Sequence, residues 1–500
     1  MADLVCWDQP AGSGIPGGFA CFVILPPLDS EGSITALAAT LYEQSGVAQQ
    51  SLDQHTVTKN DVRGPAYSVN ATEKAYDRVS CERAITETKD IAIVGGGAAG
   101  LAAAIFAARL MPERSVVVLD GAAKLGAKIL VSGGGRCNVT NRVVTTDDFS
   151  GGSPNVVRQV LSAFPVARTV AFFREIGVEF YEEHHGKLFP ESDRARSVLD
   201  ALLGEAARLV VGILLGHRVT EARPTACGFN IVTDVATLST RTLVLATGGK
   251  SLPKTGSDGS GYRLAESLGH TLEPLTPSLV ALVLNGCFHT PLSGISHEVE
   301  LTVEATGWKP VRVSGVLLWT HFGVSGPVTL DVSRHWHRAR LQERDVAVFA
   351  NLVGGKDSSS VERELLTIAS DQPRVQLHNA MARLIPARLA DAILGTLGIV
   401  GTTPMAHLPK DVRRTVVKSM VRWILPVQDS RGYAHAEVTA GGVKLGEVNP
   451  RTLGSRICPR LYLTGEILDV DGRIGGFNFQ WAWSSAWVVA TGLCAAMNQD

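Results

Sequence analysis

The stretch of sequence that decides the fold covers residues 90–120 and reads DIAIVGGGAAGLAAAIFAARLMPERSVVVLD. It opens with the apolar run Ile91–Val94, which is typical of a strand buried on both faces. The turn Gly95–Gly100 follows at once, and the alanine-rich segment Leu101–Leu110 predicts a helix. A second apolar strand, Val116–Asp120, ends in an acid. This order predicts a βαβ unit with a short crossover, which is the opening of a dinucleotide-binding α/β domain.

The glycines of this turn follow the pattern G-x-G-x-x-G, and each has a separate physical task. Gly95 allows the tight turn, Gly97 lets the backbone approach a pyrophosphate closely, and Gly100 lets the helix touch the strand. The pyrophosphate then lies at the N-terminus of the helix, where backbone amides and the helix dipole stabilise its charge. Asp120 stands where a carboxylate accepts hydrogen bonds from an adenosine ribose, and an acid there disfavours a 2′-phosphate.

Composition and charge limit the class of protein. With 500 residues, of which 45% are hydrophobic, the chain is long enough for two or three packed domains. The 47 basic and 48 acidic residues nearly cancel, so we expect a small-molecule substrate and neither a nucleic-acid nor a membrane partner. The 8 cysteines form no CxxC pair, which indicates reduced thiols in a cytoplasmic protein, with no disulfide framework and no metal site. The apolar run Phe19–Pro27 is about half as long as the ~20 residues that span a bilayer. No oligomeric state is predicted.

The chain divides into four predicted parts. Residues 1–89 mix glycine, proline and polar residues without sustained periodicity, so we expect a poorly ordered extension. Residues 90–278 and 432–500 carry the α/β pattern, and the apolar helix expected near the C-terminus brings the chain back to its first sheet. Between these segments, residues 279–355 predict an inserted β-rich substrate module and residues 356–431 predict a helical module.

A second glycine-rich region lies in residues 128–138, which read KILVSGGGRCN. Three consecutive glycines let the backbone approach a flat ligand closely, and Arg136 and Asn138 could bind a phosphate or the polar edge of a flavin ring. The glycines of 256–261 follow no strand and have the wrong spacing for a second nucleotide turn. A separate nicotinamide domain is therefore not expected.

These residues resemble the BaiN-like (YhiN-type) family of FAD-binding oxidoreductases, which are also labelled aminoacetone-oxidase-like. The resemblance runs from about Asp90 to the C-terminus. It rests on the first glycine turn and on four further segments: SGGGRCNVTN (132–141), ATGGKSLPKTGSDGSGY (246–262), THFGVSGP (320–327) and residues 436–487, which contain AEVTAGGV, GEILDVDG and GGFNFQWAWSS. The extension before Asp90 departs from the family pattern.

The resemblance implies an α/β fold of the two-dinucleotide-binding-domain (Rossmann-like) type, with a β-barrel-like and a small helical module inserted in the FAD domain. It also implies which residues contact FAD, with Val219 acting through its backbone. The implied contacts are Gly95, Gly97, Ala98, Ala99, Gly100, Asp120, Lys128, Ser132, Gly133, Gly134, Arg136, Asn138, Val219, Thr247, Gly248, Gly465, Glu466, Gly475, Gly476, Phe477 and Asn478.

The C-terminal contacts have a physical rationale. Gly465-Glu466 follows a predicted strand and places a carboxylate where it suits a ribityl hydroxyl. Gly476-Phe477-Asn478 opens a helix whose N-terminus stabilises negative charge on the flavin. We therefore expect two helix N-termini, far apart in the sequence, to hold opposite ends of one FAD molecule.

The expected activity is hydride transfer between flavin N5 and an unidentified small organic substrate, with transient NAD(P)H as one electron donor. A reductase and an oxidase both fit the residues. Cys137 and His321 are weak catalytic candidates, because Cys137 lacks a neighbouring cysteine and a packing or backbone-bonded role suits His321 better. Glu437, Thr439 and Lys444 are candidate polar contacts to the substrate. The alternatives are a flavin-dependent RNA-modifying or RNA-associated protein, which would need a basic groove, and a non-catalytic flavin-binding redox sensor.

Overall fold

The computed structural model describes residues 85–498. Its main sheet has the strand order β7-β2-β1-β10-β9-β8, and β20 also pairs with β10. The first four strands and β20 run parallel, whereas β9 pairs antiparallel with both of its neighbours, β10 and β8. The strands are β1 (Ile85–Val94), β2 (Val116–Asp120), β7 (Gly212–Leu215), β8 (Val219–Thr225), β9 (Gly228–Thr233), β10 (Thr237–Leu245) and β20 (Leu461–Leu463).

The parallel register brings the carboxyl ends of four strands to one edge of this sheet. Val94 of β1 lies opposite Leu119 of β2 and Leu245 of β10, and Leu245 lies opposite Leu463 of β20. The C-terminal part of the chain therefore does return to the first sheet. In open α/β sheets, ligands bind in the crevice outside these carboxyl ends.

Strand β1 begins earlier than the sequence predicts. The prediction placed residues 85–89 in the poorly ordered extension, but they pair with β10 through an irregular register between Ile85 and Lys89. The segment TETK carries no apolar run, so its strand pairing leaves no signal in the sequence. The remainder of the predicted extension, residues 1–84, lies outside the described residues.

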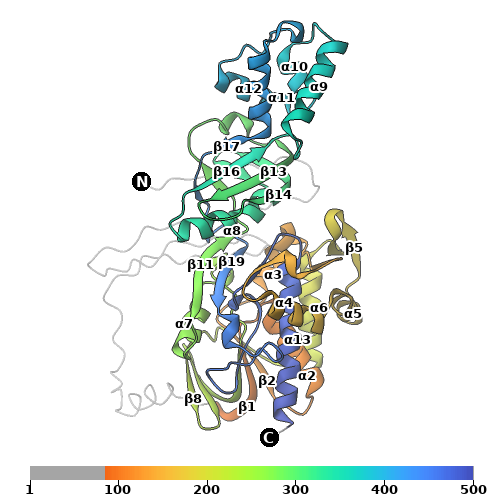
Figure 1. Cartoon of the computed structure of the whole chain (residues 1–500). Helices are drawn as coiled ribbons and strands as arrows, with labels where there is room; N and C mark the ends of the chain where they lie inside the picture. Colours follow the sequence, from red (N-terminus) through yellow and green to blue (C-terminus); the bar gives the residue numbers. More distant parts are fainter. Residues whose placement is uncertain (1–84, 499–500) are drawn as a thin grey trace, which may run out of the picture. The chain divides into compact units, whose positions relative to one another are not determined.

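Helices α2 (Ala98–Leu110) and α13 (Phe477–Met497) pack against each other beside the main sheet (Figure 1). Helix α2 is buried from Ala99 to Ala108, and its alanines permit a close approach. At their contact Phe106 meets Trp487 edge to face, with ring centroids 5.3 Å apart. The first and last helices of the domain therefore share one core. The other helices of the domain are α3 (Ala127–Val131), α4 (Pro154–Ala163), α5 (Val166–Glu175), α6 (Ala195–Arg208) and α7 (Ser260–Ser267).

Helices α4 and α5 form the only stretch of the described chain, Pro154–Glu175, that is long and apolar enough to span a membrane by length and composition. The chain breaks between them at Phe164 and Pro165, because the residue before a proline is driven out of the helical conformation. Only part of each helix is buried, which is typical of amphipathic helices on the surface of a domain.

The inserted region contains a second large sheet, ordered β17-β16-β13-β14-β15-β12-β18, with α8 packed against it. The sheet strands are β12 (Leu282–Leu284), β13 (Ser296–Ala305), β14 (Val311–Thr320), β15 (Gly323–Ser325), β16 (Val346–Asn351), β17 (Trp423–Leu425) and β18 (Val427–Ser430). The helices of the region are α8 (Pro327–Leu341), α9 (Ser358–Asp371), α10 (Leu377–Met381), α11 (Ala387–Leu397) and α12 (Lys410–Val421).

Two predicted boundaries differ from this arrangement. Helix α8 lies within the segment predicted to be strand-rich, since β-branched residues such as Val328, Thr329 and Val332 obscure its helical pattern. Strands β17 and β18 fall in the predicted helical segment 356–431, yet they pair with β16 and β12 of the sheet. The helical module is therefore itself inserted between strands of the β module.

Smaller sheets connect these regions. Strand β11 (Leu272–Ser278) leads toward the inserted sheet, and β19 (Val438–Val443) returns antiparallel beside it (Figure 1). Strand β21 (Val470–Gly472) pairs with β4 (Phe149–Gly151). A third small sheet contains β3 (Thr140–Asn141), β6 (Lys187–Pro190) and β5 (Phe180–Glu183). Through a buried ion pair, Arg334 of α8 holds Asp471 of β21, with N–O distances of 2.6 and 2.9 Å.

Candidate active site

A cavity of about 800 Å³ opens at the carboxyl edge of the main sheet and is called the glycine-lined cavity here. Its size lies within the range of small-molecule and cofactor sites. Most predicted FAD contacts line it; Gly100, Gly465 and Phe477 do not. The lining contacts are Gly95, Gly97, Ala98, Ala99, Asp120, Lys128, Ser132, Gly133, Gly134, Arg136, Asn138, Val219, Thr247, Gly248, Glu466, Gly475, Gly476 and Asn478.

The three glycines of the first turn differ in what surrounds them. A Cβ at Gly95, whose φ is +105°, would lie 2.5 Å from the Ala246 carbonyl oxygen, and a Cβ at Gly100 would lie 1.8 Å from the Gly95 carbonyl oxygen. At Gly97, by contrast, a Cβ meets no described atom within 4 Å. Gly95 and Gly100 therefore serve close packing of backbone, while Gly97 faces open cavity. Helix α2 starts there without a side-chain cap, so its first amides are available to an anion.

Asp120 is held in a fixed orientation at the end of β2. One carboxylate oxygen accepts a hydrogen bond from the Gly96 amide at 2.7 Å, and the other accepts from the Ala122 amide at 2.8 Å. Each carboxylate oxygen retains a further acceptor site. The side chain lines the cavity and can therefore accept hydrogen bonds from ribose hydroxyls, as the sequence predicts.

The C-terminal Gly-Glu turn lies directly against the first glycine turn. A Cβ at Gly465, whose φ is +76°, would lie 2.6 Å from the Ala99 Cβ. The neighbouring Glu466 accepts hydrogen bonds from Lys128 Nζ at 2.7 Å and from the Thr439 amide at 2.9 Å. Segments that are far apart in the sequence therefore meet at one wall of the cavity. This convergence is the central requirement of the predicted FAD site.

A second helix N-terminus reaches the cavity at α13. Gly475 and Gly476 have φ values of +128° and +92°, and a Cβ at Gly476 would lie 2.5 Å from the Thr140 carbonyl oxygen. Asn478 holds the preceding turn through two hydrogen bonds of 2.8 Å with the backbone of Gly472. The side chain of Phe477, in contrast, is buried and packs edge to face with Phe149. Phe477 thus stabilises the helix start from behind and does not line the cavity.

Three buried polar atoms of the cavity wall have no hydrogen-bond partner in the described part of the chain. They are Asn138 Oδ1, Thr247 Oγ1 and Ser257 Oγ. A buried polar atom left unpaired costs about 1–3 kcal/mol, so such atoms at a cavity wall indicate a polar ligand. The donor and acceptor groups of FAD would satisfy all three. The residues present therefore fit the cofactor that the sequence implies.

Arg136 lines the cavity and also pairs with a protein carboxylate. Its guanidinium pairs with Glu183 at 2.5 Å and lies over the Phe189 ring, 4.2 Å from the centroid. Its guanidinium also lies 3.6 Å from Asp193, so its charge partners are protein carboxylates. Arg136 therefore fixes the position of Glu183 at the cavity wall.

Neither weak catalytic candidate lines the cavity. Cys137 is fully buried with a φ of 64°, and burial raises the pKa of its thiol to about 12, so it stays protonated at neutral pH. His321 is exposed in the turn between β14 and β15, where its ring packs on Phe322. We assign no chemistry to either residue.

Of the three candidate substrate contacts, only Glu437 lines the cavity. Thr439 is buried, and its hydroxyl accepts hydrogen bonds from the amides of Lys250 and Ser251, which makes it a structural residue. Lys444 is paired loosely with Glu273, at 3.8 Å. Lys187 also lines the cavity, although no motif or spacing in the sequence singles it out.

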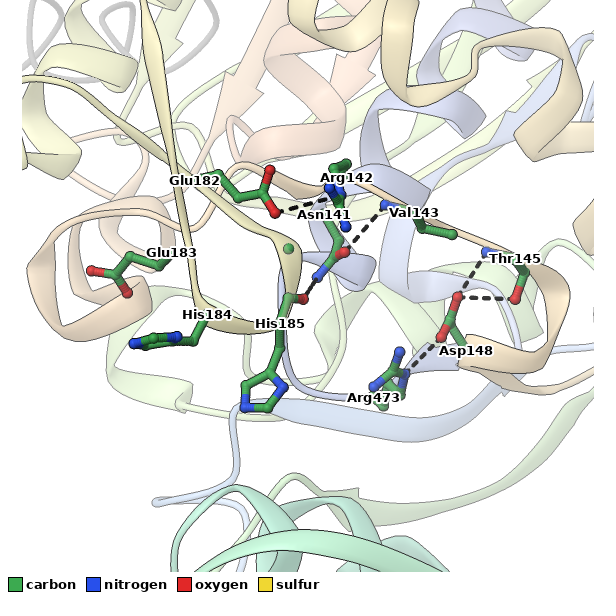
Figure 2. A pocket seen from close by; sticks show the side chains of 11 residues that line it. Asn141, Arg142, Val143, Thr145, Asp148, Glu182, Glu183, His184, His185 and Arg473 are labelled. Carbon is green, nitrogen blue, oxygen red and sulfur yellow. Dashed lines mark hydrogen bonds and ion pairs between the residues drawn. The ribbon is translucent and has the colours of Figure 1, made fainter.

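A wide polar vestibule of about 1040 Å³ adjoins the glycine-lined cavity and shares Glu183 and Arg473 with it (Figure 2). Its charged side chains are mostly paired. Arg473 holds Asp148 at 2.6 Å, and Arg142 lies 3.4 Å from Glu182. The vestibule also contains His184 and His185. Its lining is mixed in charge and does not form the basic groove that the RNA alternative needs.

A parallel sheet whose crevice joins two glycine-rich helix starts and a strand-end acid is the architecture of a Rossmann-type, FAD-dependent oxidoreductase. The chain belongs to the family described as HI0933-like protein Rossmann domain, whose family model matches residues 89–492. The predicted resemblance to BaiN-like oxidoreductases is thereby confirmed.

Relatives with assigned names match this chain along nearly their whole length. The 3-dehydro-bile acid delta(4,6)-reductase of Clostridium scindens is 34% identical over 398 residues, which cover 80% of this chain and 97% of the relative. The ribosomal RNA dihydrouridine synthase of Escherichia coli is 33% identical over 417 residues, which cover 82% of this chain and 99% of the relative. A solved structure of 3-ketosteroid-delta4-(5alpha)-dehydrogenase from Rhodococcus jostii aligns with a TM-score of 0.41 at 15% identity, covering 82% of this chain and 99% of that one.

Proposed function

We propose that the protein reduces a carbon–carbon double bond conjugated to a carbonyl group in a small organic substrate, with NAD(P)H as the electron donor. The observation that carries the proposal is the likeness to two relatives, covered over 97% and 99% of their lengths, whose names describe the saturation of such a bond. In a 3-dehydro steroid the bond is conjugated to the ring ketone, and in uridine it is conjugated to the ring carbonyl. The chemistry is shared although the substrates differ.

The chain's own residues would hold FAD along the glycine-lined cavity. Asp120 would bind the ribose, the first turn of α2 would bind the pyrophosphate, and the N-terminus of α13 would stabilise negative charge on the flavin ring. Lys128 and Glu466 would bind the groups between these ends. When bound, FAD supplies hydride chemistry that no side chain can perform.

The vestibule supports a shared entrance for donor and substrate. It adjoins the cavity through Glu183 and Arg473, and the sequence contains no second glycine-rich nucleotide turn with the required spacing. A nicotinamide and a carbonyl substrate would therefore use the same access in turn. We also propose a cytoplasmic location, which agrees with the free state of the described cysteines.

A uridine within ribosomal RNA is a second candidate substrate, because the Escherichia coli and Haemophilus influenzae relatives are named ribosomal RNA dihydrouridine synthases. The paired charges of the vestibule favour the small-molecule reading, since RNA binding relies on unpaired Arg and Lys contacts to phosphates.

Anaerobic stopped-flow measurements on the purified yellow protein test the proposal. NADH or NADPH should bleach the flavin, and a 3-keto steroid with a conjugated double bond, or cyclohexenone, should restore its colour faster than buffer alone. Ribosomal RNA from a strain lacking dihydrouridine is the competing oxidant. Failure of both nicotinamides to bleach the flavin, combined with fast reoxidation by oxygen after chemical reduction, would identify an oxidase and refute the proposal.

A further inference from the structure

We infer that Glu437 and Lys187 form the proton-donating and carbonyl-binding pair of this active site. The inference rests on the proposed reduction of a conjugated double bond and assigns the two side chains that would complete it. Glu437 stands just before β19, and Lys187 is the first residue of β6. Both line the glycine-lined cavity.

Contacts through β6 and α8 place this pair at the α13 end of the cavity. Lys187 lies opposite Asn141 in the β3–β6 register, and Asn141 Nδ2 donates to the Gly475 carbonyl oxygen at 3.1 Å. Asp331 of α8 accepts a hydrogen bond from the Ile474 amide at 2.7 Å. Its carboxyl lies near Glu437 and Lys187, because the charges of both side chains affect its pKa. The pair therefore gathers around the turn that precedes α13, where the flavin ring is expected.

These two side chains are available to a ligand, unlike the other charges around them. Neither one makes a side-chain hydrogen bond or a close ion pair with another residue of 85–498. Their neighbours are paired: Glu183 with Arg136, Arg473 with Asp148, and Lys128 with Glu466. A cation and a carboxylate that face one cavity without partners are suited to binding a polar substrate.

The setting of Glu437 suits a proton donor. Its side chain has a large accessible surface because it opens onto the cavity, yet protein atoms surround it at depth. Burial raises the pKa of this carboxyl above its ordinary value, while the positive charges of Lys128 and Lys187 act in the opposite direction. A carboxyl with a raised pKa keeps its proton closer to neutral pH, where a general acid is most effective. The other carboxylate of this cluster, Asp331, is committed to the Ile474 amide.

When bound and reduced by the nicotinamide, FAD would supply the hydride that bonds to the β-carbon of the substrate, and the π electrons of the double bond would shift onto the carbonyl oxygen. Lys187 Nζ donates a hydrogen bond to that oxygen as its negative charge develops. The O–H bond of Glu437 then breaks, its proton bonds to the α-carbon, and the carbonyl re-forms. Glu437 is left as a carboxylate and regains a proton from solvent in the vestibule.

The variants Glu437→Gln and Lys187→Met test this assignment, with Glu298→Gln and Lys309→Met as matched controls at exposed positions of the inserted sheet region. In anaerobic stopped-flow runs, Glu437→Gln should bleach with NADPH at the wild-type rate. Its reoxidation by cyclohexenone should slow at least ~100-fold, in line with the loss of a general acid. Lys187→Met should mainly raise the cyclohexenone concentration needed for half-maximal rate. Both controls should behave as wild type, and FAD content should be equal in all five proteins.

Infrared difference spectroscopy of the resting holoprotein supplies a readout that needs no turnover. The wild type should show a carboxylic-acid C=O band that persists to higher pH than that of an ordinary glutamate, that Glu437→Gln lacks, and that persists to still higher pH in Lys187→Met. If the wild type is not reoxidised by any conjugated ketone, the proposed function fails, and the infrared band alone decides the protonation of Glu437. A wild type without this band, or a Glu437→Gln variant that is reoxidised at the wild-type rate, overturns the assignment.

Discussion

Gly97 provides the sharpest test of whether the first glycine turn holds the cofactor. A Cβ at this position meets no described atom within 4 Å, and its φ of −82° suits any L residue. Gly97→Ala should therefore leave the apoprotein folded, at a cost of about 0.5–1 kcal/mol for alanine at a helix N-cap. At Gly100 a Cβ would lie 1.8 Å from the Gly95 carbonyl oxygen, so Gly100→Ala should damage the fold itself.

The loss of FAD affinity can be worked from the contact that the methyl group would displace. The open side of Gly97 is the approach to the first amides of α2, where the pyrophosphate would accept hydrogen bonds. Losing one hydrogen bond to a charged group costs about 1.5–3 kcal/mol. Because each 1.4 kcal/mol is about tenfold in affinity, the Kd for FAD should rise about 10- to 150-fold.

Titration of apoprotein with FAD, followed by the quenching of flavin fluorescence, measures this change, and circular dichroism of the apoprotein measures its thermal stability. Gly204→Ala is the control, because Gly204 lies on α6 with open space around it and outside the cavity lining. Its FAD affinity should match the wild type. A Gly97→Ala protein that binds FAD as tightly as the wild type would refute the reasoning, since the open space at Gly97 would then not be the pyrophosphate site.

Three further outcomes are expected. Asp471→Asn should lower the free energy of unfolding by about 3–5 kcal/mol, seen as a lower urea midpoint, because Arg334 loses its buried charge partner, whose side chain is 0% exposed. Glu304→Gln, at the exposed pair with Arg422, should lower the free energy of unfolding by less than about 1 kcal/mol. Burial raises the pKa of Asp331 from 3.8 to about 6, so the folded state binds this proton more tightly than the unfolded state. Its stabilising contribution is complete below pH 3.8 and is lost by about pH 6, and Asp331→Asn should remove this decline in pH-dependent thermal melts. Among the described cysteines, exposed Cys227 and Cys287 should react with iodoacetamide first, and mass spectrometry should find Cys137 unmodified in the native protein at neutral pH.

The parts of the fold that the sequence predicts are those encoded by local patterns. The unit from Ile91 to Asp120 is recognisable because strand, turn, helix and strand follow one another without insertion. Helix α13 is equally clear, since its apolar run has a glycine pair at its start. The sheet of the inserted region was harder to predict because it combines β12–β16 with β17 and β18, which come after the helical module in the sequence. Such non-local pairing leaves no periodic signal.

The glycine positions around the cavity were predictable for a related reason. Gly95 and Gly100 are demanded by close backbone packing, and such a requirement is visible in one short segment, whereas the fold itself leaves open space at Gly97. The unpaired polar atoms of Asn138, Thr247 and Ser257 cannot be predicted in this way, because whether a side chain has a hydrogen-bond partner depends on the whole fold. Phe477 shows that position in a turn does not predict side-chain direction: it lies in the predicted turn before α13, but its side chain is buried in the core.

Lys187, which has no charged partner among residues 85–498, shows most clearly why the substrate-binding part of the cavity could not be predicted from the sequence. In the β5–β6 hairpin Lys187 lies directly opposite Glu183, and local reasoning would pair these two charges. Arg136, which arrives from the glycine-rich loop, pairs with Glu183 instead, and this guanidinium lowers the pKa of that carboxyl. Lys187 is consequently left without its local partner and faces the cavity. The charge that would bind a substrate carbonyl thus depends on a contact between residues 136 and 183. Arg136 lines the cavity as a predicted ligand contact and also holds the carboxylate that would otherwise pair with Lys187.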